Sequence, residues 1–172
     1  MDVLTLSPHQ SVTIQESTPE LLVVEATYEP GGSAPPRHSH PDQDEHFEVL
    51  EGTIEVRVDG VGRTLGVGDT IDVPRATVHD MRNAGDLRAR VRWETRPAGR
   101  TEQWFRSIDG LHRKGQVRAD GSPGPLAFAV LLAEYRDTFR LRVAPDVVLR
   151  PVVGLLSLVG RARGYDPAPP PG

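Results

Sequence analysis

Cysteine is absent from the 172 residues of this sequence, so the chain has no disulfide, no thiolate metal ligand and no cysteine nucleophile. Long apolar runs are also missing, since none approaches the roughly eighteen residues of a membrane-spanning helix. The first twenty residues lack a basic start followed by an apolar core, so we expect no signal peptide. These features predict a cytoplasmic protein for which membrane contact is not expected.

Basic clusters are lacking as well. The net charge is −4, and no stripe of basic and aromatic residues follows any segment, so we expect no nucleic-acid partner. The charge is unevenly divided: residues 1–99 hold 17 acidic and 9 basic residues, a balance of −8, whereas residues 100–172 hold 7 and 11, a balance of +4. This asymmetry favours packing of the C-terminal region on the acidic part, in its own chain or in a partner, although ordinary surface scatter explains it about as well.

Short segments rich in β-forming residues occupy most of the first hundred positions. The run from Leu21 to Glu29 is the clearest, and Gly or Asn residues separate the later ones up to Arg96. Strands of this length and spacing predict a mainly β fold, either a sandwich or a small barrel.

Histidines and a glutamate stand at a regular spacing within these strands. On a strand, side chains two positions apart point to the same face, so His38 and His40 can converge on one ion. Glu45 follows a turn-prone segment and can supply an oxygen from the neighbouring strand, and His79 ends a later strand. Imidazole nitrogens with a carboxylate and open positions are typical of a transition-metal site.

Two motifs in these segments resemble those of the cupin superfamily, specifically its small single-domain members. The first, G-x5-H-x-H-x4-E-x6-G, runs from Gly32 to Gly52, and the second, G-x5-P-x-G-x2-H-x3-N, runs from Gly68 to Asn83. Fifteen residues separate them, and the one departure is Ala76, where the pattern has glycine. The resemblance covers about residues 20–97. It implies a jelly-roll β-barrel (a double-stranded β-helix), a metal held by the two histidines, the glutamate and His79, and a homodimer.

Side-chain parity predicts what surrounds the metal. If Glu45 points inward, so does Phe47, while His46 faces outward. In the last strand Leu87, Ala89, Val91 and Trp93 form one apolar row, which should line the interior. We therefore predict a substrate pocket that includes Phe47, Met81 and Trp93. No catalytic residue stands out beyond the metal ligands.

Helical patterns follow the β region. We expect helices over residues 101–114 and 126–137, and a third apolar stretch, residues 147–159, that Pro151 and Gly154 interrupt. The predicted organisation is an N-terminal arm or edge strand (1–20), a cupin barrel (21–97), a helical extension packed on the barrel or a partner subunit (98–164) and a disordered tail (165–172). The apolar helices have three interpretations: a lid over the barrel, a dimer interface or a membrane-surface element.

The functional hypothesis is a metal-dependent cupin with one divalent transition metal, which the ligand set leaves open among Fe, Mn, Ni and Zn. Resemblance to the dioxygenase branch implies an oxidoreductase acting on a small oxygen-bearing, partly aromatic compound. One alternative is a non-catalytic module that binds a small ligand or a metal and has a sensing role. A metal-dependent isomerase is a further alternative.

Overall fold

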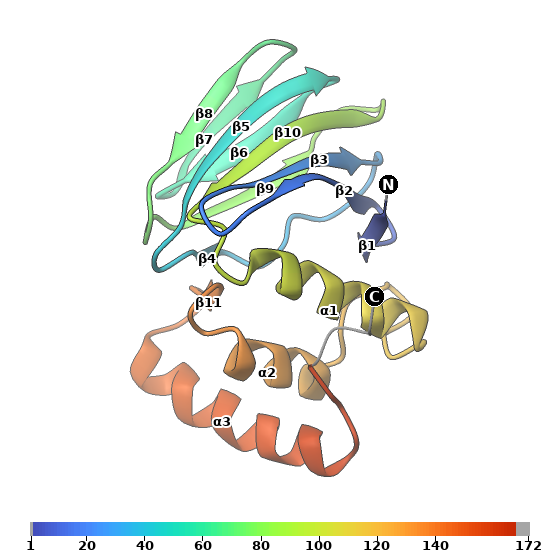
Figure 1. Cartoon of the computed structure of the whole chain (residues 1–172), viewed down its shortest axis with the longest axis vertical. Helices are drawn as coiled ribbons and strands as arrows, with labels where there is room; N and C mark the ends of the chain where they lie inside the picture. The colour runs from blue at the N-terminus through green and yellow to red at the C-terminus, as the bar shows by residue number, and fades with distance from the viewer. Residues whose placement is uncertain (1, 168–172) are drawn as a thin grey trace.

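The computed structural model describes residues 2–167, which form two antiparallel β-sheets followed by three α-helices (Figure 1). The strands are β1 (Val3–Ser7), β2 (Gln10–Ser17), β3 (Leu22–Tyr28), β4 (His38–Ser39), β5 (Asp44–Glu51), β6 (Ile54–Val58), β7 (Val61–Leu65), β8 (Thr70–Val73), β9 (His79–Asn83), β10 (Ala89–Arg96) and β11 (Arg140–Leu141). The helices are α1 (Thr101–Arg113), α2 (Pro125–Glu134) and α3 (Asp146–Ala162).

The six-stranded sheet has the order β1-β2-β3-β10-β5-β8, and the five-stranded sheet has the order β11-β4-β9-β6-β7. The predicted mainly β fold with C-terminal helices is confirmed. Within the described residues no strand pairing joins the two sheets, so the architecture is an open sandwich rather than a closed barrel.

Alternation along β5 shows how the strands bury one face. Glu45, Phe47 and Val49 are buried, whereas His46 and Glu48 between them are only partly buried, as the period of two requires. Strand β10 pairs with β5 and places Trp93 opposite Phe47. The inner faces of the sheets form a continuous apolar core with the helices.

The N-terminal segment joins the fold more extensively than an edge strand alone. Both β1 and β2 belong to the six-stranded sheet, with β2 paired to β3 along most of its length and β1 at the edge. Leu4 and Val12 are fully buried there. The N-terminal hairpin is therefore part of the sandwich.

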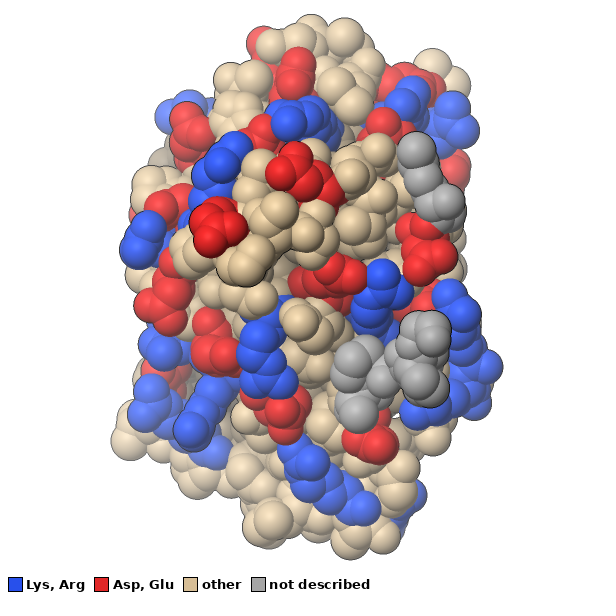
Figure 2. Space-filling view, in the orientation of Figure 1, with Lys and Arg blue, Asp and Glu red and all other residues tan. Residues whose placement is uncertain are grey.

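The helices lie below the sandwich in Figure 1, where α1 is next to the sheets and α3 is outermost. Helix α3 continues through Pro151 and Gly154 as one element of 17 residues, so neither residue interrupts it. Among residues 2–167, no helix is both long and apolar enough to cross a bilayer. Charged residues of both signs are interspersed over the visible face of the sandwich, whereas uncharged side chains predominate at the lower end, over α3 (Figure 2).

Two details of the sequence-based prediction need correction or restriction. Leu87 was expected in the inward row of the last strand, but it precedes β10 and its side chain is 78% exposed. The predicted disordered tail begins with three described residues: Pro167 is buried, and its carbonyl accepts a hydrogen bond of 2.6 Å from Ser107 Oγ. The rest of that segment, residues 168–172, lies outside the described residues.

Candidate metal centre

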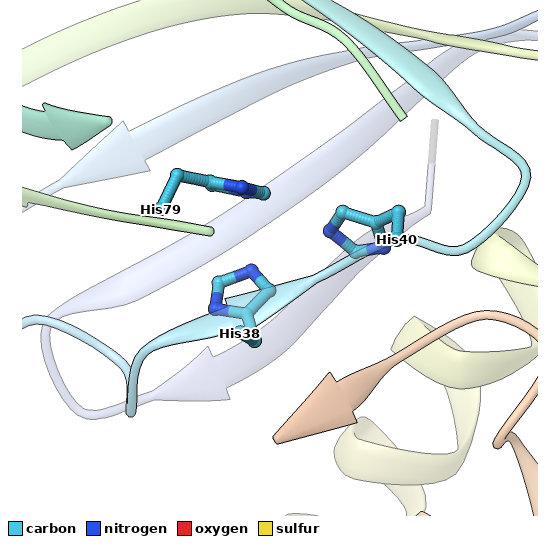
Figure 3. A group of neighbouring side chains, drawn as sticks. All are labelled: His38, His40 and His79. Atoms are coloured by element: carbon cyan, nitrogen blue, oxygen red, sulfur yellow. The ribbon is translucent and has the colours of Figure 1, made fainter. Parts of the chain in front are cut away.

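Three histidines from two neighbouring strands meet in the interior. His38 lies on β4, His40 follows it directly, and His79 begins β9, where it is paired with His38. One ring nitrogen from each of the three lies within 4.8 Å of the other two, and all three side chains are buried. Figure 3 shows the three imidazoles turned toward a common space.

Backbone carbonyls define the orientation of all three rings. Nδ1 of His38 lies 2.9 Å from the carbonyl of Pro36, and Nδ1 of His79 lies 3.1 Å from that of Thr77. Nδ1 of His40 lies 2.6 Å from the carbonyl of Thr138, which is 98 positions away in the sequence. Because a carbonyl only accepts, each Nδ1 carries the proton and donates. In the neutral imidazole, Nε2 is then the nitrogen with the lone pair that a metal can bind.

Glu45 faces the same space from β5 in the other sheet. Its Oε1 lies 3.3 Å from Nε2 of His40, and its Oε2 lies 3.0 Å from Nε2 of His79. The indole N–H of Trp93 donates to Oε1 at 3.0 Å and so holds the carboxylate in this position. Such a donor behind a carboxylate is typical of the outer shell of metal sites.

Burial and mutual repulsion set the protonation of the cluster. Burial lowers the pKa of His38 and of His40, and neighbouring imidazoles add to the effect. Burial alone would raise the pKa of Glu45, but His40 and His79 outweigh it and hold that pKa below its usual value. Burial likewise lowers the pKa of His79, yet the adjacent Glu45 carboxylate raises it on balance. The favoured state has neutral imidazoles at His38 and His40 beside an ionised carboxylate.

This arrangement fits a divalent metal ion. Nε2 of His40 and Oε2 of Glu45 are buried and have no hydrogen-bond partner among the described residues. The Nε2 atoms of the histidines and the carboxylate oxygens of Glu45 thus face one another. A divalent cation between these groups would bind all of them at once, and nitrogen–oxygen sets of this kind suit transition metals.

A cavity of about 470 Å³ opens beside the three histidines. The side chains proposed for the substrate pocket, Phe47, Met81 and Trp93, line it together with them. Other aromatic side chains complete its wall: Tyr28, Trp104, Phe105, Phe128 and Phe139. The cavity therefore combines the histidine cluster with a largely apolar and aromatic wall, to which a few polar side chains such as Gln10 and Asp120 also contribute.

The structure thus brings together all four predicted ligands and all three predicted pocket residues, while metal binding itself stays a prediction. His46 lies outside, as expected, with Nδ1 2.7 Å from a carboxylate oxygen of Asp72 on the surface. The pocket predicted from the sequence included no residue of the helical region. Trp104 and Phe105 of α1 line the cavity, whereas the sequence left open whether the helices form a lid over the barrel, a dimer interface or a membrane-surface element.

Other motif residues have structural roles. Gly52 has φ +75°, and a Cβ there would lie 2.6 Å from the carbonyl oxygen of Arg88. The side-chain amide of Asn83 donates to the carbonyls of Tyr28 and Leu87 at 3.0 and 2.8 Å. Ala76 adopts φ +64°, the conformation for which the motif has glycine. The turn thus keeps its geometry despite the substitution.

Comparison with known families places these features in context. Residues 24–93 match the family described as "Cupin domain". Germin-like protein subfamily 2 member 1 of Arabidopsis thaliana is 39% identical over 69 residues, which cover 37% of this chain and 31% of that protein. Protein SchB of Streptomyces halstedii is 37% identical over 54 residues, which cover 31% of this chain and 39% of that protein. The match therefore spans only about a third of the length of these curated relatives.

Solved structures show the same fold. KdgF from a Halomonas species superposes with a TM-score of 0.51 and 24% identity over 56% of this chain and 86% of that one. An RmlC-like cupin from Shewanella frigidimarina gives a TM-score of 0.53 and 22% identity over 59% of this chain and 87% of that one. At this level of identity the similarity concerns the fold alone.

Proposed function

Residues 24–93 of this chain form a cupin domain, and on that premise we propose that the protein is a metal-dependent oxidoreductase of the dioxygenase type. Its metal would be a divalent transition ion held by His38, His40, Glu45 and His79. The observation that carries this proposal is the convergence of three imidazoles and one carboxylate at the wall of a cavity lined by aromatic side chains.

The bound metal would supply a Lewis acid and a template for the oxygen atoms of the substrate. Side chains of the protein would contact the substrate and orient the proposed ligands. The aromatic rings of Phe47 and Trp93, whose centroids are 5.4 Å apart and whose planes are inclined by 37°, offer an apolar wall for a partly aromatic substrate. Trp93 also donates to Glu45, so one side chain contacts both the substrate space and a proposed ligand.

The proposed substrate class is a small, oxygen-bearing and partly aromatic compound. Both atoms of O₂ would enter the organic product, and the substrate would supply the electrons that reduce them, so no separate reductant is needed. The aromatic lining favours this class over strongly charged compounds, because burying a charge without a partner is costly.

Metal content and oxygen uptake test the proposal. The protein would be prepared without metal, loaded in turn with Fe(II), Mn(II), Ni(II) or Zn(II), and assayed for oxygen uptake with a panel of catechols and flavonols. We expect stoichiometric metal and uptake with at least one pairing, and loss of both in His40→Ala. The matched control is His46→Ala, which removes the outward-facing histidine of β5 and should change neither quantity.

Three results would contradict the proposal in whole or in part. If the wild-type protein binds none of these metals, the proposed metal centre is wrong. If a folded His40→Ala variant keeps its full metal content, His40 is not a ligand. Metal binding without oxygen uptake on any substrate would remove the dioxygenase function alone.

A second candidate is a binding module with a sensing role. It is favoured by one observation: α1 and Phe139 line the cavity, so a ligand there would contact the helical region directly. Tight binding of a small ligand under every metal, without turnover, would support this function and exclude the enzyme.

We also propose that the protein forms a homodimer through α3. Six large apolar residues on its outer face are between 38% and 79% exposed: Val147, Val148, Val152, Leu155, Leu158 and Val159. They lie on one side of the helix, and a second copy packed against this face would remove these apolar side chains from water. The face lacks the aromatic residues typical of membrane-surface helices, which favours a second copy over a bilayer.

A further inference from the structure

Residues 138–142 form a short segment between α2 and α3 that runs alongside the chain bearing His38 and His40. We call this segment the strap. It contains β11, which pairs antiparallel with β4 so that Arg140 is opposite Ser39 and Leu141 is opposite His38. The backbone N–H of Arg142 extends the pairing by donating to the carbonyl of Arg37 at 2.7 Å. In Figure 3 the orange arrow of β11 runs beside the ribbon that bears His38 and His40.

The strap also contacts the two histidine rings. The carbonyl of Thr138 accepts the Nδ1–H of His40 at 2.6 Å in a buried hydrogen bond. The ring of Phe139 stacks on His38, with centroids 4.4 Å apart and planes inclined by 14°. Trp104 of α1 stacks on Phe139 at 4.6 Å and 15°. These three rings form a continuous column from α1 to the proposed metal position.

A side chain of the strap holds the residue between the two histidines. Nε of Arg142 donates to Oγ of Ser39 at 2.9 Å, and its guanidinium also contacts Asp146 at the start of α3. Ser39 is fully buried, so its hydroxyl requires a partner. The strap therefore contacts all three consecutive residues from His38 to His40.

Strand β4 has little other support. It is two residues long, and on the side away from the strap it pairs with β9 only at His38 and His79. A strand this short cannot define the direction of two side chains by its own sheet pairing. The strap therefore supplies much of the support for His38 and His40, beside the carbonyl of Pro36 and the N–H of Ala76.

We propose that the strap is part of the metal centre, and that Phe139 and Arg142 are positioning residues that aim His38 and His40 at the ion. This inference rests on the proposed metal binding. It extends the site beyond the matched cupin domain, which ends at residue 93, to residues 138–142 of the helical region. Outer partners of metal ligands commonly change metal affinity by about 10- to 100-fold.

Metal affinity measured by chelator competition tests this role. The full-length protein would be titrated with Zn(II) and with Co(II), whose absorption spectrum reports ligand geometry. We expect Phe139→Ala to weaken binding by about 10-fold or more and to alter the Co(II) spectrum. Arg142→Ala should weaken binding in the same direction, and Arg142→Lys should restore part of the loss because its ammonium can donate to Ser39.

The matched control is Val130→Ala in α2. Val130 is fully buried and packs near Gly160 of α3, so its truncation loosens the helical region without touching the cavity or a histidine. We expect wild-type affinity and an unchanged Co(II) spectrum for this variant, despite a lower melting temperature. Circular dichroism of each metal-free variant checks the fold. If Phe139→Ala does not fold, the Arg142→Ala and Arg142→Lys variants, which alter a more exposed side chain, test the inference instead.

The outcomes separate the inference from the function on which it rests. If the wild-type protein binds neither ion, the proposed metal centre fails and this role fails with it. If the wild type binds and folded Phe139→Ala and Arg142→Ala bind equally well with the same spectrum, the strap is structural only and the proposed function stands. Equal weakening in Val130→Ala would also overturn the inference, because the effect would then be one of general stability.

Discussion

Ala76 shows how a single residue carries strain next to the candidate site. Its φ of +64° is in the left-handed region, which costs an ordinary L-residue roughly 1–2 kcal/mol. Its backbone N–H donates to the carbonyl of His40 at 2.7 Å, so the turn that holds this conformation also holds a proposed ligand. The hydrogen bond to His40 helps keep Ala76 in the costly conformation.

Ala76→Gly should therefore stabilise the protein. Glycine adopts this φ without strain, but its greater freedom in the unfolded chain offsets part of the gain by about 0.4–1 kcal/mol. We expect a net increase of about 0.5–1 kcal/mol in the free energy of unfolding, measured by chemical denaturation. An unchanged or lower value would show that the turn is not strained at this position.

At the scale of elements, the contact between α2 and α3 depends on one glycine. A Cβ at Gly160 would lie 2.7 Å from Cγ2 of Val130 and 2.9 Å from the backbone oxygen of Leu126. The backbone oxygen cannot rotate away, so the helices would have to separate. At Gly154, in the middle of the same helix, a Cβ would have no described atom of another element within 4 Å.

These two glycines predict opposite effects of the same substitution. Gly160→Ala should lower the melting temperature, because separation of α2 and α3 outweighs the better helix propensity of alanine. Gly154→Ala should raise stability by up to about 1 kcal/mol, since only the propensity changes. Thermal denaturation of both variants checks this, and a stabilising Gly160→Ala would contradict the described packing.

The three helices are also connected through one carboxylate. Glu134 at the end of α2 contacts Arg100 at 2.8 Å and Arg161 of α3 at 3.1 Å. The hydrogen bond from Arg100 is the main reason that the pKa of Glu134 lies below its ordinary value. A folded-state pKa below the unfolded one means that the stabilisation is complete above the unfolded pKa and is lost as pH falls through the folded pKa.

The stability of the helical region should therefore decrease on acidification below the ordinary glutamate pKa of about 4.3. Glu134→Gln removes this contribution, so the difference in melting temperature between wild type and variant should shrink as the pH is lowered. Melting curves at a series of pH values measure it. A difference that stays constant with pH would mean that the ion pairs contribute nothing to the stability of the fold.

For the whole molecule, the exposed face of α3 is the feature that predicts assembly. Replacing Leu155 and Leu158 together with glutamate would place two charges on that face, and burying them without partners is costly. We expect the double variant to be monomeric under conditions where the wild type is dimeric, as measured by light scattering after size exclusion. The control is Leu87→Glu, which alters an equally exposed leucine beside the strands.

If the wild-type protein is monomeric, the proposal that it dimerises through α3 is wrong. Binding of that monomer to anionic vesicles, lost in the double variant, would assign the same face to a membrane surface instead. A dimer that persists in the double variant would place the interface elsewhere on the molecule.

The sequence by itself determined the mainly β fold with C-terminal helices and the positions of the proposed ligands, whereas the tertiary structure decided that the sheets form an open sandwich. His38, His40, Glu45 and His79 are identified by local spacing, and the period of two along each strand decides which face each occupies. Gly52 is identified for the same reason, because its requirement for positive φ is local to the turn. Features that depend on a few neighbouring residues are predictable from them.

Only the tertiary structure decided what encloses the site. The contact of Thr138 with His40 joins residues 98 positions apart, and the stacking of Phe139 on His38 depends on where α2 ends relative to β4. The exposure of Leu87 and the unbroken course of α3 through Pro151 were likewise set by packing rather than by pattern. Apolar spacing specifies that a helix face is buried but not what buries it, because the hydrophobic effect is non-directional.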